Sequence, residues 1–128
     1  MGDFDADGVT ATVLLTEALR SMVAERRQII PYIPDRFDEG YGLNLESLTQ
    51  LRAKGVSLVI SVDCGIRSPV EAAHARSIGL DLIITDHHGL GREIPPAVAV
   101  INPKRPDSTY PERMLAGVGI AFKLAQAI

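Results

Sequence analysis

Apolar and polar positions alternate in blocks along the chain, and these blocks predict an order of helices and strands. Apolar residues recur at three- and four-residue steps over Val9–Val23, which predicts an amphipathic helix. Leu58–Val62 and Leu82–Thr85 are short, continuous apolar runs rich in β-branched residues, as in strands buried on both faces. Gln28–Ile33 and Ala97–Ile101 are further short β-rich runs, and we expect strands there as well.

Three more helices are predicted from their end signals. Asn44 can cap a helix that Gly55 ends. The segment Ser68–Glu71 has the pattern of a capping box with proline at the first helical position, and its helix should stop at Gly79. A last helical pattern covers Ala116–Ala127.

The order of these elements predicts the fold class. Strands that alternate with helices form right-handed βαβ units, which gives an α/β domain with a parallel sheet and helices on both faces. The chain has 128 residues, enough for one domain. We expect the loop Asp35–Leu43 to be functional, because it is long for a simple connector.

Composition and charge exclude several classes of protein. The chain is 46% hydrophobic and 23% charged, so it is globular rather than disordered. It has neither an apolar run of about 18 residues nor a signal-peptide pattern, so we expect no membrane span. Its one cysteine indicates a reducing compartment such as the cytoplasm. A net charge of −3 argues against a basic surface over the whole domain, so any contact with polyphosphate needs a local patch or bound metal.

Acidic and imidazole side chains follow the predicted strand ends or occupy a place where a strand end belongs. Because ligands of open parallel sheets bind beyond the carboxyl ends of the strands, we expect these side chains to converge on one edge. Clustered carboxylates repel each other unless cations are bound, and oxygen donors with one or two imidazoles suit Mn²⁺ or Mg²⁺, with Zn²⁺ or Co²⁺ as alternatives. The candidates are Asp3, Asp5, Asp7, Asp63, Asp86, His87 and His88.

Such a cluster predicts hydrolysis of a phosphoester. A carboxylate that bridges two ions would hold them about 3.5–4 Å apart, a spacing at which a bridging water becomes an attacking hydroxide. The alternative is a calcium loop beginning at Asp3, but that loop needs a glutamate where Leu14 stands.

The chain also has the features of a fragment. Only Met1 and Gly2 precede Asp3, although a motif of this kind belongs after a strand, and the chain stops inside or just after a helix. We therefore expect residues 1–128 to be part of a longer protein; the alternative is a naturally short protein with a variant sheet.

Taken together, these motifs resemble those of the DHH phosphoesterase superfamily, and the resemblance covers the whole chain. Asp3–Gly8, Val62–Gly65 and Asp86–His88 resemble its motifs I, II and III. Three further stretches resemble the branch of the superfamily that degrades single-stranded DNA. These stretches are Ile33–Leu43, Ile101–Pro103 and Leu115–Phe122.

The resemblance implies a role for each acidic position. Asp5, Asp7, Asp63 and His87 are then metal ligands, with Asp63 as the bridge between two ions. Asp3 lies beside them as a ligand or as a partner of one.

The same resemblance implies roles for Asp86 and His88, and it implies further elements outside residues 1–128. Asp86 is expected to orient an imidazole, and His88 to face the scissile phosphate as electrostatic stabiliser or general acid. A first strand, a fourth motif with a further aspartate and a domain that closes over DNA are expected outside residues 1–128.

A second set of residues could contact substrate. Arginine and lysine can bind phosphate, tyrosine can stack on a base, and the first N–H groups of a helix can hold an anion. Each has a structural alternative: a salt bridge or bracing within the loop, an exposed charged turn, or close helix packing. The candidates are Arg36, Tyr41, Lys104, Arg105, Gly117 and Gly119.

The resemblance implies a metal-dependent 5′→3′ exonuclease that releases 5′-mononucleotides from single-stranded DNA in repair and recombination. It implies single-stranded DNA as the partner, no membrane, and contacts with a single-strand-binding protein and a helicase through regions outside this chain. Two alternatives stay open. One is a phosphodiesterase of short oligonucleotides or cyclic dinucleotides, and the other is a non-catalytic relative that serves as a replication scaffold.

Overall fold

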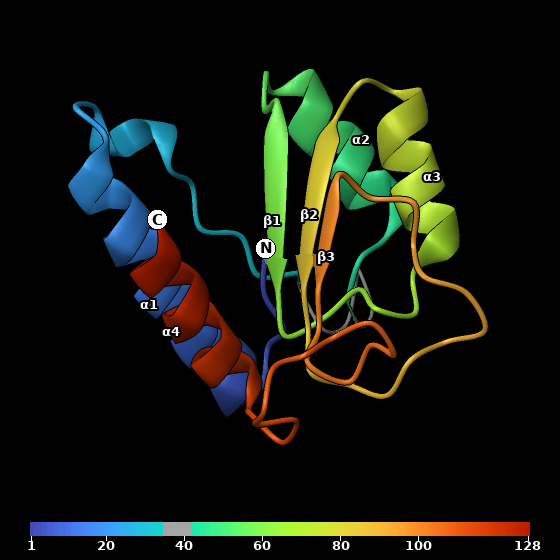
Figure 1. Ribbon diagram of the computed structural model, residues 1–128. Helices are drawn as coiled ribbons and strands as arrows, with labels where there is room; N and C mark the ends of the chain where they lie inside the picture. The colour runs from blue at the N-terminus through green and yellow to red at the C-terminus, as the bar shows by residue number, and fades with distance from the viewer. Residues whose placement is uncertain (35–41) are drawn as a thin grey trace.

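The computed structural model describes residues 1–34 and 42–128, which form a parallel sheet between two layers of helices (Figure 1). Within these residues the sheet has three strands in the order β1-β2-β3, and both neighbouring pairs are parallel. The elements are α1 (Ala6–Met22), the 3₁₀ turn η1 (Arg26–Gln28), α2 (Leu45–Ala53), β1 (Leu58–Val62), α3 (Pro69–Ser77), β2 (Asp81–Thr85), β3 (Ala99–Ile101) and α4 (Gly117–Ala127).

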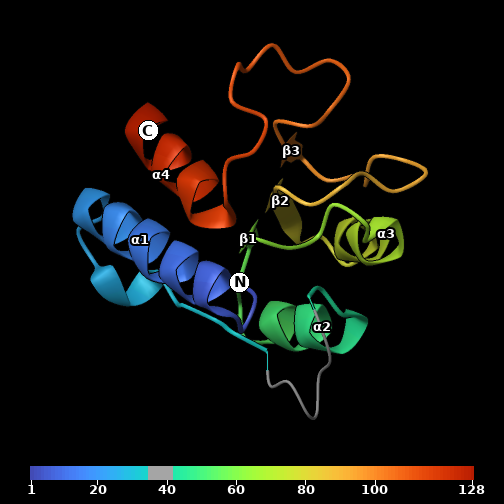
Figure 2. The same cartoon turned by 90° about the horizontal axis from the view of Figure 1, so that it is seen from below.

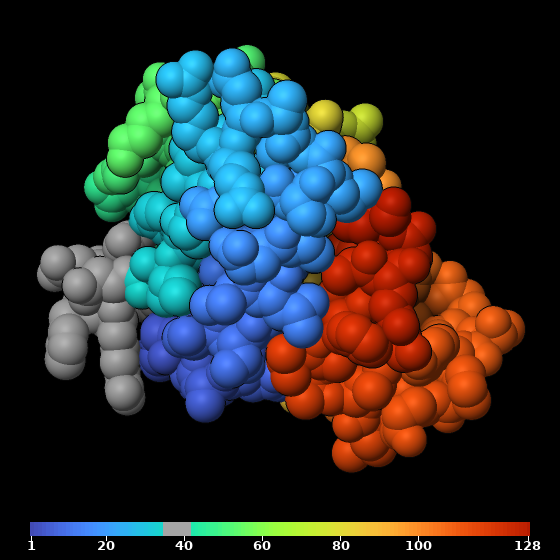
Figure 3. Space-filling view, turned by 90° about the vertical axis from the view of Figure 1, so that its left-hand side faces the viewer, coloured from blue at the N-terminus to red at the C-terminus, as the bar shows by residue number. Residues whose placement is uncertain are grey.

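Helices cover both faces of the sheet. Seen along the strands, α1 and α4 lie together on one face, and α2 and α3 lie on the other (Figure 2). The space-filling view from the side of α1 shows α1 and α4 packed against each other along their length (Figure 3). The expected α/β class, with a parallel sheet and helices on both faces, is confirmed.

Strand register aligns the ends of the three strands. Val62 pairs with Thr85, and Thr85 pairs with Ile101, so the three strands end in one row of paired residues. A parallel bridge joins Gly2 to Val62, and the Val62 N–H donates to the Met1 carbonyl at 2.8 Å. The residue that follows each of these positions therefore lies at the same edge of the sheet.

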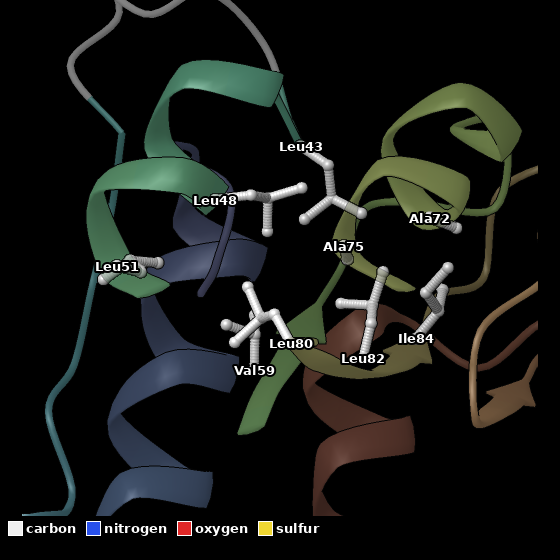
Figure 4. Close-up of a cluster of buried hydrophobic side chains, with 9 residues drawn as sticks. All are labelled: Leu43, Leu48, Leu51, Val59, Ala72, Ala75, Leu80, Leu82 and Ile84. Carbon is white, nitrogen blue, oxygen red and sulfur yellow. The ribbon is translucent and has the colours of Figure 1, made fainter. Parts of the chain in front are cut away.

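Two apolar clusters hold the layers together. The larger one fills the space between the sheet, α2 and α3, and its members point toward one another (Figure 4). The smaller one joins α1 and α4 to β1 through Ala11, Leu15, Val62 and Ala121. The members of the larger cluster are Leu43, Leu48, Leu51, Val59, Ala72, Ala75, Leu80, Leu82 and Ile84.

One predicted strand is wrong. Residues 29–34 form no strand, and η1 occupies part of the run Gln28–Ile33. Pro31 and Pro34 have no N–H to donate, so this segment cannot form a regular ladder. It keeps one contact beside the sheet, because the Tyr32 carbonyl accepts from the Gly2 N–H at 3.0 Å.

Two helix starts also differ from the prediction. The first helix begins at Ala6 rather than Val9, because the Asp5 side chain accepts from the Gly8 N–H at 2.9 Å and caps it. The capping box at Ser68 does not form: Ser68 has φ −114° and ψ 57°, outside the extended conformation of a capping residue, and its side chain makes no cap hydrogen bond. Asn44 caps α2 as predicted, at 2.7 Å from the Ser47 N–H.

None of the helices in residues 1–34 and 42–128 is both long enough and apolar enough to cross a membrane.

Candidate metal centre

Four buried polar residues mark the carboxyl edge of the sheet. Each comes directly after a strand or after the Gly2–Val62 bridge, so the register places all four at one level. Their exposed fractions are between 1% and 4%. Buried polar groups need partners, so this row marks a built site rather than a chance cluster. The residues are Asp3, Asp63, Asp86 and Asn102.

Asp63 is the central carboxylate of this edge. Its Oδ1 atom is buried and has no hydrogen-bond partner among the described residues, although His87 Nε2 lies 3.0 Å away. Burial, and then the nearby carboxylates of Asp7 and Asp5, raise the pKa of Asp63 to about 7. A buried acid with acidic neighbours and no bonded donor fits a site that a cation completes.

Two groups of donor atoms meet at Asp63. In the first, Asp63 lies with His87 and His88; in the second, it lies with Asp3 and Asp5. The donor atoms of each group lie within 4.8 Å of one another. Within the described residues, Asp63 is common to both groups, which is the arrangement that a carboxylate between two ions requires.

Asp7 faces the same space from the first turn of α1. Its Oδ2 atom lies 3.6 Å from His87 Nε2. Both of its oxygens also accept hydrogen bonds at 2.7 Å from the first residues of α4, Oδ2 from the Gly117 N–H and Oδ1 from the Val118 N–H. The anion at this helix start is therefore a carboxylate of the chain itself.

Asp86 holds the His88 imidazole and belongs to neither of the two groups of donor atoms. Its Oδ1 lies 2.7 Å from His88 Nδ1 and accepts from the His88 N–H at 3.0 Å. Its Oδ2 accepts from the Ile66 N–H at 2.9 Å. Two of these three contacts go to His88, so Asp86 fixes the orientation of the His88 ring.

Asn102 is a site residue that the sequence interpretation did not identify. Its Nδ2 donates to the His88 carbonyl at 3.0 Å, and its Oδ1 accepts from the Lys104 N–H at 2.8 Å. It ties the end of β3 to the turn that carries both histidines. Its position directly after a strand was the available signal, the same one that indicated Asp63.

The thiol beside Asp63 is buried. Cys64 is 1% exposed, and burial raises the pKa of its thiol to about 12. A nucleophilic cysteine needs an accessible thiolate near neutral pH. The chemistry of the site therefore belongs to the carboxylates and imidazoles.

The predicted substrate contacts fall into different environments. Arg36 and Tyr41 lie outside the described residues. The Arg105 guanidinium donates to Asp107 at 2.9 and 2.6 Å and to a carbonyl of β3 at 2.6 Å, so it braces its own turn. Lys104 lies on the same turn, two residues beyond Asn102.

The two glycines of α4 differ in their surroundings. Gly117 begins the helix and lies against Asp63, whereas Gly119 lies against the Leu115 side chain. The N–H of Gly117 is already bonded to Asp7.

Fold and site together define a parallel α/β domain with a carboxylate–imidazole centre at the carboxyl edge of its sheet. Residues 1–128 match the family described as DHH family, N-terminal domain. Because the match covers the whole chain, the chain belongs to the DHH family.

Several proteins of known activity are similar to this chain. It is 50% identical over 127 residues to the single-stranded-DNA-specific exonuclease RecJ of Bacillus subtilis, covering 99% of this chain and 16% of that protein. It is 45% identical over 128 residues to RecJ of Escherichia coli, covering all of this chain and 22% of that protein. The chain thus spans about a fifth or less of the length of these relatives.

A solved structure also matches the fold. The crystal structure of an exonuclease RecJ bound to manganese superposes with a TM-score of 0.82 at 36% identity, over 98% of this chain and 31% of that one. RecJ from Thermus thermophilus in complex with Mn²⁺ gives a TM-score of 0.75 at 32% identity, over 98% of this chain and 17% of that one.

Proposed function

We propose that this chain is the metal-binding part of a longer exonuclease that hydrolyses single-stranded DNA with the help of two divalent ions. The observation that carries the proposal is the place of Asp63 in both donor groups. The similarity to RecJ exonucleases of two bacteria supports the substrate class. We further propose 5′→3′ polarity, release of 5′-mononucleotides and a role in repair and recombination, as the resemblance of the sequence motifs implies.

The donor set fits Mn²⁺ or Mg²⁺. Carboxylate oxygens with one or two imidazole nitrogens are ligands of these ions, and the similar structures are bound to manganese. We assign Asp63 to both ions, Asp7 and His87 to one side of it, and Asp5 with Asp3 to the other. Bound ions would neutralise the phosphodiester and supply a hydroxide at neutral pH.

His88 has the geometry of a residue that acts on the substrate. Asp86 holds the ring at Nδ1, and Asn102 holds the backbone carbonyl of the same residue. A ring fixed in this way can stabilise charge on a phosphate or give a proton to the leaving oxygen without reorganising first. We propose this role for His88 and a purely positioning role for Asp86.

Contacts with the DNA backbone are expected along the same edge. We propose Lys104 for such a contact in preference to Arg105, because the Arg105 guanidinium is already bonded to Asp107 and to β3. Arg36 and Tyr41 stay proposed contacts with phosphate and base.

Further parts of the proposed enzyme lie outside these residues. We propose a fourth-motif aspartate, a first strand and a closing domain there, with surfaces for a single-strand-binding protein and a helicase. Because the proposed substrate is cellular DNA, we place the enzyme in the cytoplasm.

Hydrolysis of defined oligonucleotides by the full-length protein tests this function. With Mn²⁺ present, we expect mononucleotides from single strands, little product from blunt duplex, and inhibition by a block at the 5′ end but not at the 3′ end. Asp63→Ala should abolish the activity. A preference for dinucleotides would instead identify an oligonucleotide phosphodiesterase, and a protein that neither binds Mn²⁺ nor hydrolyses DNA would be a scaffold.

A further inference from the structure

We propose that α4 is a positioning element for the metal centre and that Gly117 is the residue that makes this possible. The inference rests on the proposed metal site, and it concerns how two of its carboxylates are held. The start of α4 contacts both: its first N–H groups bind Asp7, and its first Cα lies against Asp63.

The start of α4 holds both oxygens of the Asp7 carboxylate. Asp7 lies in the first turn of α1, and its two oxygens each accept one backbone N–H of α4 at 2.7 Å. The start of a helix carries partial positive charge and unpaired N–H groups, which favour a carboxylate there. Backbone donors cannot rotate away as side chains can, so Asp7 faces His87 in one defined orientation.

The contact with Asp63 leaves no room for a side chain. A Cβ built at position 117 would lie 2.6 Å from Asp63 Oδ1 and 2.7 Å from its Cβ and Cγ. Asp63 is 1% exposed and its backbone is fixed at the end of β1, so it has nowhere to move. Glycine at 117 therefore allows the start of α4 to contact the buried Asp63 carboxylate. The Oδ1 atom of this carboxylate has no hydrogen-bond partner among the described residues.

The packing of α4 against α1 couples the positions of Asp7 and Asp63. The helices α1 and α4 lie side by side in two views (Figures 2 and 3), and Ala11 and Ala121 are fully buried where they meet β1. A displacement of the start of α4 would move Asp7 and release Asp63 together. Metal affinity should therefore depend on the fit at position 117.

Alanine at position 117, compared with alanine at 119, tests the proposal. Both changes put alanine into the same helix, which by itself favours helix formation. At 119 the new Cβ would lie 3.1 Å from the end of the flexible Leu115 side chain, which can move aside. In the full-length protein we expect Gly117→Ala to lower Mn²⁺ affinity in calorimetry about tenfold or more, and Gly119→Ala to leave it unchanged. Equal affinities for the two variants would overturn the proposal.

A double variant keeps the test decisive if Gly117→Ala does not fold. Asp63→Gly removes the whole side chain that the new Cβ would meet, including the Asp63 Cβ at 2.7 Å, and glycine readily adopts the φ of 62° at position 63. In that background Gly117→Ala should no longer lower the melting temperature. Recovery of folding in Asp63→Gly/Gly117→Ala supports the proposal. An equal loss of melting temperature in both backgrounds would contradict it.

The readouts separate this inference from the proposed function. Mn²⁺ affinity and melting temperature need no substrate. A protein that degrades no single-stranded DNA but shows these effects would retain the positioning role and lose the proposed activity. A protein that degrades single-stranded DNA but has the same Mn²⁺ affinity in Gly117→Ala and Gly119→Ala would retain the proposed activity and lose the positioning role.

Discussion

Asp63 has a backbone conformation that places its carboxylate in the site. Its φ is 62°, in the left-handed region that residues other than glycine seldom adopt, although aspartate tolerates it better than most. Directly before it, Val62 ends β1 in register with Thr85. The turn that begins at Asp63 thus departs from the strand at once, and such strained positions gather at functional sites.

The raised pKa of Asp63 predicts a pH-dependent cost in the metal-free protein. Its value is about 7 in the fold against an ordinary 3.8, so the folded state holds this proton more tightly than the unfolded chain does. The cost is absent below the ordinary pKa, grows as the pH rises between the two values, and is complete above about 7, on the order of a few kcal/mol. With a chelator present, Asp63→Asn should therefore gain melting temperature over the wild type as the pH rises through this window.

The control for this prediction is Asp81→Asn, which changes an exposed aspartate at the start of β2. The difference in melting temperature between this variant and the wild type should stay flat over the same pH range. A flat profile for Asp63→Asn as well would contradict the assignment of Asp63 as a buried acid with acidic neighbours.

The adjacent imidazoles should separate metal binding from catalysis. His87 Nε2 lies between Asp63 and Asp7, whereas the His88 ring is held by Asp86. His87→Ala should lose Mn²⁺ affinity in calorimetry. His88→Ala should keep it and lower kcat by about 10²-fold or more. The reverse pattern would mean that the two roles are exchanged.

At the residue scale, sequence position located the ionisable groups but indicated neither Asn102 as a site residue nor the contact between Gly117 and Asp63. The rule that ligands follow strand ends identified Asp63 and Asp86 because acids in that place are chemically conspicuous. Asn102 obeys the same rule, but a neutral amide carries no such signal. The closeness of Gly117 to Asp63 depends on how α4 packs on β1, and no local pattern contains that distance.

At the scale of helices and strands, the sequence signals for helix ends were correct where the capping residue adopts the backbone conformation that its type favours. Asn44 caps α2, and the glycines at 55 and 79 end their helices with positive φ, as predicted. Ser68 had the residue types of a capping box without its dihedral angles. The run Gln28–Ile33 had strand composition, but its proline at 31 prevents a ladder.

The residues before α2 and α3 predict different results for the same kind of change. Asn44→Ala should lower the free energy of unfolding by about 1 kcal/mol, because the Ser47 N–H loses its partner at the start of α2. Ser68→Ala should change it by less than about 0.5 kcal/mol, since its side chain caps nothing. Denaturant unfolding of both variants measures the difference, and equal losses would show that Ser68 caps α3 after all.

For the molecule as a whole, the fold brings three distant stretches to one edge and makes that edge acidic. The chain carries a net charge of −3, and carboxylates converge where the phosphates of the proposed DNA substrate would bind. Like charges at short range repel, so this edge needs cations before it can accept a polyanion. The parallel sheet and its two helix layers followed from the order of elements, whereas the pairing of α1 with α4 did not.

This charge distribution predicts that DNA binding depends on metal. Using full-length His88→Ala, which should bind without rapid hydrolysis, we expect Mn²⁺ to raise the affinity for a short single-stranded oligonucleotide in fluorescence anisotropy. Addition of a chelator should reverse the effect. The same affinity with and without metal would show that DNA is held away from the acidic edge.

The central claim is that one pocket holds two divalent ions joined by Asp63. Electron paramagnetic resonance of the full-length protein titrated with Mn²⁺ tests it most directly, because two ions about 3.5–4 Å apart couple magnetically. We predict a coupled spectrum in the wild type and in the control Asp81→Asn, and its loss in Asp63→Ala. A wild-type spectrum of isolated Mn²⁺ alone, or a coupled spectrum that survives in Asp63→Ala, would contradict the account.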